Sequence, residues 1–442
     1  MKVISPRHSF SLDYTPKQWV VFCNTILLIL VTFMCGMVIY EICDINQKFV
    51  TILDSSAIAI DILATNIINS KTTPYWKTIN NDVSVYSAYY KAQSSDKGLI
   101  IIIGSSSKSG IDFKDIRCLI KYADTEDISI MEASYEKFSN CNTLILRCPS
   151  KSGSVPTKVV LISNEDIISK KWIDIEMISR KTDGDIIAPK IAACVQPLDE
   201  SVSVKQIQEF VTFYEIVGLS HFYFYNNNAT RSTVDFIQHL IYNDYPISIL
   251  PWNKKLESSE KCPALGYEYV QDCLHQALNK YSDVLTVNTA DFFVPLKYFS
   301  IDKMLLNFNN SYEMLHINKA NYCDIHDQKE VIQQSIKNML FRGPICPSKT
   351  NYFLRPEFKA AIEFHGASSA SKRFAKFVQD LPENEGIVQH LVRKCDSDVT
   401  LDSSAFKYFK KINKSLIFEA YKQTSRKTVV QIPFPFSLKF FL

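Results

Sequence analysis

This sequence of 442 residues has no pronounced excess of positive or negative charge, no internal repeat and no low-complexity segment. Its 49 lysine and arginine residues nearly balance its 46 aspartate and glutamate residues, which leaves a net charge of only +3. Proteins dedicated to nucleic acid carry a pronounced basic excess, so this class of function is disfavoured. The hydrophobic content of 46% instead predicts a chain that folds around real cores, in one large or two ordinary domains.

Charged residues are also missing between Trp19 and Tyr40. The segment is long enough to cross a bilayer as a helix, and it exceeds the apolar core of a cleaved signal peptide. Basic residues precede it and acidic residues follow it, so the positive-inside rule predicts a cytoplasmic tail over 1–18, a signal anchor over 19–40 and a lumenal remainder. The alternative is a buried helix of a soluble domain.

Cysteine is frequent, with twelve residues, which suits an oxidising compartment. Connectivity does not follow from sequence alone. Cys141 and Cys148 lie close together in a polar region, and we predict that they pair. Cys262 with Cys273 is a second candidate pair.

The part of the chain that follows the anchor divides into two predicted regions. Segment 41–96 is mixed and polar, with a weakly helical first half, and we interpret it as a stem. Segment 97–190 contains short apolar runs bounded by turn-rich stretches, beginning with the run from Gly98 to Gly104. This spacing predicts a small, mainly β module.

From Ile191 onward strands and helices alternate. Short β-type runs occur at 191–195, 222–225, 247–250 and 284–287, and helical periodicity occurs between them at 204–217, 234–241 and 267–281. This order predicts parallel strands joined by crossover helices, which is an α/β fold. Ligands of such folds bind at the carboxyl ends of the strands. In this chain those ends carry Gln196, Asn226 to Asn228, Trp252, and Asn288 to Asp291.

The last of these strand ends, Asn288-Thr289-Ala290-Asp291, interrupts an otherwise apolar stretch that runs from Val284 to Pro295. A metal–diphosphate site needs several carboxylates, and this stretch supplies only Asp291. The position therefore favours a ligand site, but the composition does not favour a strong metal site.

A series of short motifs follows in order from Cys194 to Arg393. They are Cys194-Val195-Gln196-Pro197-Leu198, Glu209-Phe210 followed by Val217-Gly218-Leu219-Ser220-His221-Phe222-Tyr223-Phe224-Tyr225-Asn226, Leu250-Pro251-Trp252, Gln271-Asp272-Cys273-Leu274-His275, Ala290-Asp291-Phe292-Phe293-Val294-Pro295, Phe353-Leu354-Arg355-Pro356, His365 and His390. In order and spacing this series resembles glycosyltransferase family 92, a group of type II Golgi membrane enzymes.

The resemblance implies a GT-A-like, Rossmann-type nucleotide-sugar domain, which we place at 191–400. It also implies inverting transfer of a sugar, in studied members galactose from UDP-galactose, to a glycan hydroxyl with Mn²⁺ or Mg²⁺. The family's Asp-x-Asp-Glu aligns with Asn288-Thr289-Ala290-Asp291, so the first acid is an amide and the second a methyl group. A relative that binds a glycan or a nucleotide sugar without turnover is therefore the alternative function.

The same resemblance supplies candidate roles for individual residues. Asp291 and Asn288 are predicted metal and donor contacts, and Asp291 is the predicted catalytic residue, although it could simply be a turn residue. His390 is the predicted third metal ligand, because GT-A enzymes often supply a histidine near the end of the domain, or else a hydrogen-bonded core or loop histidine. His365 is a predicted donor contact.

Two further donor contacts have structural alternatives. Trp252 is predicted to stack on the donor, or else to fill the core. Arg355 is predicted to pair with a phosphate, or else with a structural carboxylate.

Three other features have weaker signals. Asp272 is expected to have a structural role. An inverting reaction needs a general base, and Asp380, Glu383 and Glu385 lie in a suitable loop-like segment, but no pattern distinguishes one of them. The tail, 401–442, is basic between Lys407 and Lys427 and is predicted to dock on the preceding domain, or else to contact lipid.

Overall fold

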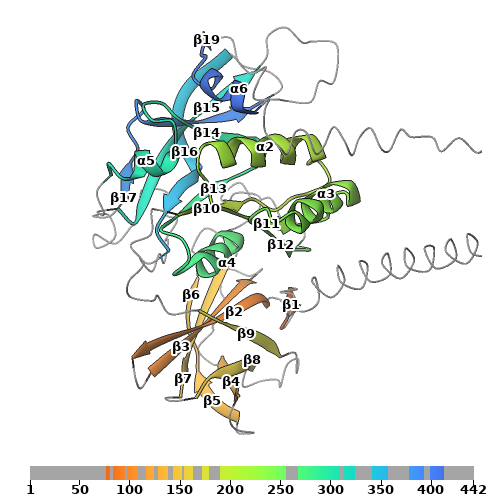
Figure 1. Cartoon of the computed structure of the whole chain (residues 1–442). Helices are drawn as coiled ribbons and strands as arrows, with labels where there is room; N and C mark the ends of the chain where they lie inside the picture. Colours follow the sequence, from red (N-terminus) through yellow and green to blue (C-terminus); the bar gives the residue numbers. More distant parts are fainter. Residues whose placement is uncertain are drawn as a thin grey trace, which may run out of the picture. The chain divides into compact units, whose positions relative to one another are not determined.

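The computed structural model describes residues 76–79, 83–94, 97–106, 116–123, 128–137, 143–151, 154–162, 172–178, 190–254, 267–308, 312–323, 341–356, 378–392 and 399–412. These residues form two β-sheets and five helices (Figure 1). The predicted anchor, 19–40, lies outside the described residues. Among the helices that are described, none combines the length and the apolar character needed to span a bilayer.

The first sheet has nine strands, in the order β5-β4-β8-β9-β2-β3-β7-β6, with β1 paired to β2. The strands are β1 (Lys77–Thr78), β2 (Val83–Ser94), β3 (Lys97–Ser106), β4 (Arg117–Tyr122), β5 (Ile128–Glu132), β6 (Ser134–Lys137), β7 (Thr143–Ser150), β8 (Pro156–Ile162) and β9 (Ile173–Met177). Strands β1 and β2 lie inside 41–96, which the sequence predicted to be stem. The first sheet therefore begins before residue 97, because β2 and β3 form one long antiparallel hairpin.

Disulfides differ from both predicted pairs. Cys148 in β7 is bonded to Cys118 in β4, and both are fully buried in the core of the first sheet. Cys273 is bonded to Cys194, although 79 positions separate the two residues. The predicted partners Cys141 and Cys262 lie outside the described residues. Closeness in sequence did not predict the pairing, because each residue of an extended strand adds about 3.4 Å to the distance between Cys148 and the residues that precede it.

The second sheet has ten strands, in the order β12-β11-β10-β13-β16-β15-β18-β14, with β17 on β15 and β19 on β16. They are β10 (Ile191–Val195), β11 (His221–Asn226), β12 (Ile247–Pro251), β13 (Asp283–Val287), β14 (Asp291–Pro295), β15 (Met314–Cys323), β16 (Phe341–Leu354), β17 (Val378–Asp380), β18 (Gly386–Leu391) and β19 (Thr400–Leu401). Strands β12, β11, β10 and β13 are mutually parallel. The predicted α/β alternation is therefore confirmed.

Three of the five helices are the predicted crossovers: α2 (Val204–Ile216), α3 (Arg231–Tyr242) and α4 (Glu268–Ala277). Helix α2 begins with a reciprocal capping box, in which Ser203 and Gln206 each accept from the other's backbone N–H. Gly218 follows the C-cap residue Val217, and its φ of +99° favours glycine. The other two helices, α5 (Ile301–Leu305) and α6 (Phe406–Ile412), are short.

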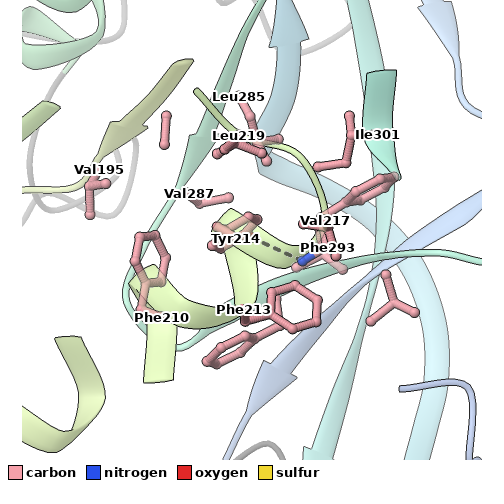
Figure 2. Packing of buried hydrophobic residues seen from close by; sticks show 14 of the residues in the cluster. Val195, Phe210, Phe213, Tyr214, Val217, Leu219, Leu285, Val287, Phe293 and Ile301 are labelled. Atoms are coloured by element: carbon pink, nitrogen blue, oxygen red, sulfur yellow. Dashed lines mark hydrogen bonds between the residues drawn. The ribbon is translucent and has the colours of Figure 1, made fainter. Parts of the chain in front are cut away.

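The side chains of β10 alternate between two apolar cores. Ile191, Ala193 and Val195 belong to the core that α2 and α3 cover, whereas Ala192 and Cys194 face the core that α4 covers. Figure 2 shows the first core, where Phe210, Phe213 and Tyr214 of α2 gather with strand residues. This burial on both faces explains why the central parallel strands are almost wholly apolar.

Helix α6 lies in the segment predicted as tail. Its Tyr408 packs edge-on against Phe213 of α2, with ring centroids 5.5 Å apart. Lys407 donates to three backbone carbonyls that follow β14, those of Pro295, Leu296 and Tyr298. This described part of the tail is thus docked on the second sheet.

Asp272 of α4 joins the two sheets. Its buried carboxylate accepts hydrogen bonds from Ser87 Oγ and Tyr89 OH of β2, both at 2.6 Å, and from Tyr225 OH of β11 at 2.7 Å. The structural role expected for Asp272 is therefore the one observed.

Candidate functional site

The turn between β13 and β14 is closed by its own hydrogen bonds. Asn288 Oδ1 accepts from the backbone N–H of Ala290 at 2.8 Å, and the Asn288 carbonyl accepts from the N–H of Asp291 at 3.0 Å. The Asn288 N–H in turn donates to Asp291 Oδ2 at 3.4 Å. This is an Asx-type turn, so the polar side chains at the strand end first serve to shape the backbone.

Tyr214 fixes the backbone that follows this turn. Its hydroxyl donates to the Asp291 carbonyl and accepts from the Phe293 N–H, both at 2.9 Å, and Figure 2 shows the contact with Phe293. Burial raises the pKa of Tyr214 well above its ordinary value, so the hydroxyl keeps the proton that it donates. Helix α2 therefore sets the position of Asp291.

Residues from three other strands meet on the buried carboxylate of Asp291, which is 1% exposed. His390 Nδ1 of β18 lies 2.7 Å from Oδ1, Lys319 Nζ of β15 lies 3.2 Å from the same oxygen, and Asn351 Nδ2 of β16 donates to Oδ2 at 3.0 Å. Burial alone would raise the pKa of Asp291. The hydrogen bond from His390, the charge of Lys319 and the amide of Asn351 outweigh burial, and the net pKa is lowered.

Because Asp291 is ionised, the hydrogen-bonding roles of its neighbours follow. His390 Nδ1 must carry a proton to donate to a carboxylate. Asn351 presents its amino group, which also donates to the Thr286 carbonyl at 3.1 Å. The carboxylate is thus surrounded by donors on both oxygens.

This arrangement does not fit a divalent cation. Mn²⁺ and Mg²⁺ need free oxygen lone pairs, but both oxygens of Asp291 already accept and Asn288 Oδ1 is used within its own turn. Ala290 adds no ligand, and Lys319 would repel a metal. Over the described ranges no group of three or more His, Cys, Asp or Glu residues could hold a metal ion. Asp291, Asn288 and His390 do converge as predicted, but they bind one another.

A shallow, nearly filled hollow borders the turn. It is lined by Gln206, Glu209, Thr289, Ala290, Phe292 and Leu391. Thr289 and Ala290 belong to the turn, so the hollow lies directly beside it. Gln206 and Glu209 of α2 bring polar groups to it.

Trp252 lies in the core instead of in an open cleft. It is fully buried, with its ring centroid 4.6 Å from that of Tyr86 and 5.2 Å from those of Trp76 and Tyr225. Trp252 therefore fills the core, which was the alternative prediction, and does not stack on a donor. Tyr86 of β2 and Tyr225 of β11 both contact this ring, so Trp252 packs between the two sheets.

Arg355 also has the structural role that was its alternative prediction, since it pairs with a structural carboxylate. Its Nε lies 3.4 Å from Asp283 Oδ1, and its guanidinium covers the Tyr312 ring at 4.3 Å. Asp283 opens β13 whereas Asn288 follows its end, so Arg355 sits roughly 16 Å along the strand from the turn. The predicted phosphate contact does not fit this position.

His365 lies outside the described residues. The remaining candidates that the structure describes do not join the site. Gly386 pairs with Pro295 at the opposite end of the β14–β18 ladder from His390, roughly 13 Å away. The suggested bases precede Gly386: Asp380 pairs with His316, Glu385 pairs with Lys297, and Glu383 is exposed.

Sequence reasoning missed Lys319, Asn351 and Tyr214. Lys319 and Asn351 belong to the antiparallel strands β15 and β16, where no motif marks them. Tyr214 was visible only as one apolar position of a helix. Its spacing from the motif gave no sign that it contacts Asp291.

Comparison with known proteins agrees with the motif series. The sequence model of glycosyltransferase family 92 matches residues 189–433, more than half of the chain. No curated protein matches the chain.

Solved structures show weaker similarity. The mannosyltransferase PcManGT from Pyrobaculum calidifontis, in complex with GDP-Man and Mn²⁺, matches at 10% identity over 30% of this chain and 36% of its own, with a TM-score of 0.21. TarS from S. aureus, in complex with UDP, matches at 15% identity over 46% and 60%, with a TM-score of 0.27. Glucosyl-3-phosphoglycerate synthase from Mycobacterium tuberculosis matches at 8% identity over 48% and 73%, with a TM-score of 0.25. Scores this low carry no argument about fold or chemistry.

Proposed function

Because the chain belongs to glycosyltransferase family 92, we propose that it transfers a sugar from a nucleotide-sugar donor to a glycan hydroxyl. UDP-galactose is the donor to test first. The proposed catalytic domain is the GT-A-like region 191–400. We further propose a single-pass type II protein of the Golgi, anchored by Trp19–Tyr40 with its C-terminal domain in the lumen.

One observation carries this proposal. Asp291 and His390 are 99 positions apart, and they meet at 2.7 Å just beyond the carboxyl end of β13. This is the edge at which open α/β sheets bind their ligands. The meeting of Asp291 and His390 at this edge supports a donor site there.

A second function has its own supporting observation. Ala290 replaces an acid of the family motif, and every oxygen of the remaining carboxylate, Asp291, already accepts from a donor of the chain. A protein that binds a nucleotide sugar or glycan without turning it over would also fit this arrangement.

An assay of UDP release by full-length protein in detergent distinguishes the two functions. We expect UDP release from UDP-galactose in the presence of acceptor glycans, and loss of that release in Asp291→Asn. Asp235→Asn is the matched control, because this aspartate is on α3 with a side chain that is 61% exposed. UDP binding without release would support the binding function. Absence of both UDP binding and glycan binding would contradict both functions.

A further inference from the structure

Lys319 brings a charge to the site that no motif predicts. Its side chain is 19% exposed, and its ammonium lies 3.2 Å from Asp291 Oδ1. Among the described residues, Asp291 is the only partner recorded for this ammonium. An ammonium has three N–H donors, so this single ion-pair contact leaves two of them for a ligand.

Strand register explains how Lys319 reaches the site. Lys319 of β15 pairs with Val388 of β18, which is two positions from His390. His390 in turn pairs with Asp291 of β14. Residues two apart on a strand share a face, so Lys319 and His390 project from the same face of the sheet. That face carries the buried carboxylate between them.

The charges of the site balance without a metal. Asp291 and Lys319 carry opposite unit charges, which sum to zero. The Asp-x-Asp-Glu that the resemblance implies would carry three carboxylates, so this chain lacks two of those negative charges, at Asn288 and Ala290. With a single carboxylate left, one monovalent ammonium is enough to balance the charge of the turn.

We propose that the Lys319 ammonium, held by Asp291, binds the diphosphate of the nucleotide-sugar donor in the place of a divalent cation. The inference rests on the proposed function, since it names the cation of that donor site. Lysine binds phosphate as a compact point charge. Asp291 holds the ammonium in place, and His390 and Asn351 hold Asp291.

The competing explanation is an ion pair that only stabilises the fold. The two explanations predict different responses to a substitution that keeps the hydrogen bond and removes the charge. Lys319→Gln retains an amide N–H that can donate to Asp291, so the fold is kept. The same substitution removes the positive charge that would bind the diphosphate. Lys319→Arg retains the charge.

Calorimetric titration of full-length protein with UDP in excess EDTA tests the proposal. We expect wild-type binding that added Mn²⁺ leaves unchanged within twofold. Loss of one charged hydrogen-bonding group predicts that Lys319→Gln weakens UDP binding by about ten- to a hundredfold, with Lys319→Arg closer to wild type. Lys303→Ala, which removes an exposed lysine of α5, should bind as wild type does. Thermal melting confirms that each variant is folded.

Two results would overturn the proposal while the proposed function stands: UDP binding that requires Mn²⁺, or undiminished binding by folded Lys319→Gln. If wild type binds no UDP with or without Mn²⁺, the proposed donor site is wrong, and the proposed role of Lys319 is wrong as well.

Discussion

Asp272 should make the stability of this protein depend on pH in a direction opposite to that of most carboxylates. It is fully buried, and no cation is recorded beside it within the described residues. Burial raises the pKa of Asp272 from 3.8 to about 6, against the opposing effect of hydrogen bonds from Ser87, Tyr89 and Tyr225. Burial is therefore the dominant cause.

The sign and size of the effect follow from linkage between protonation and folding. A carboxyl group whose folded pKa is raised favours the folded state while it is protonated. Its contribution is complete below pH 3.8 and is lost as pH rises through about 6. A shift of this size at 1.36 kcal/mol per pKa unit corresponds to about 3 kcal/mol.

Urea unfolding of wild type and Asp272→Asn across pH 4 to 7.5 measures this contribution. Asparagine keeps the shape and cannot ionise, so wild type should lose about 3 kcal/mol relative to the variant as pH rises. Asp235→Asn, on an exposed helix face, should show no such trend. A difference between wild type and Asp272→Asn that stays constant with pH would refute the reasoning.

Two other predictions concern the elements that hold the site. Tyr214→Phe removes the bonds to the Asp291 carbonyl and the Phe293 N–H, and should lower the free energy of unfolding by about 1–3 kcal/mol in urea titrations; no change would show that this contact does not hold β14. Replacing Cys194 and Cys273 together by serine removes a cross-link that spans 79 positions, and should cost about 2–5 kcal/mol in non-reducing unfolding. Equal stability of wild type and the double variant would contradict the observed pairing.

Local pattern was enough to predict the parallel half of the second sheet. The run Ile191–Val195 is apolar throughout because both of its faces are buried, and the helix that follows has one apolar side. These signals operate over a few neighbouring residues, so they are visible in the sequence. The motif series added the expectation that Asp291 and His390 belong to one site.

The partners of Asp291 could not be predicted in the same way. Lys319 reaches it through the register of β15 with β18, a long-range pairing that no local period encodes. Trp252 failed as a donor contact for a similar reason: its ring is covered by Tyr86 of the first sheet and by Trp76, which precedes β1. Long-range packing decided both outcomes.

The most direct measurement is UDP binding by the full-length chain in excess EDTA, followed by addition of Mn²⁺. A carboxylate already bound by Lys319 and His390 predicts binding in EDTA that Mn²⁺ does not strengthen. Binding that appears only when Mn²⁺ is added would contradict a donor site in which lysine serves as the cation.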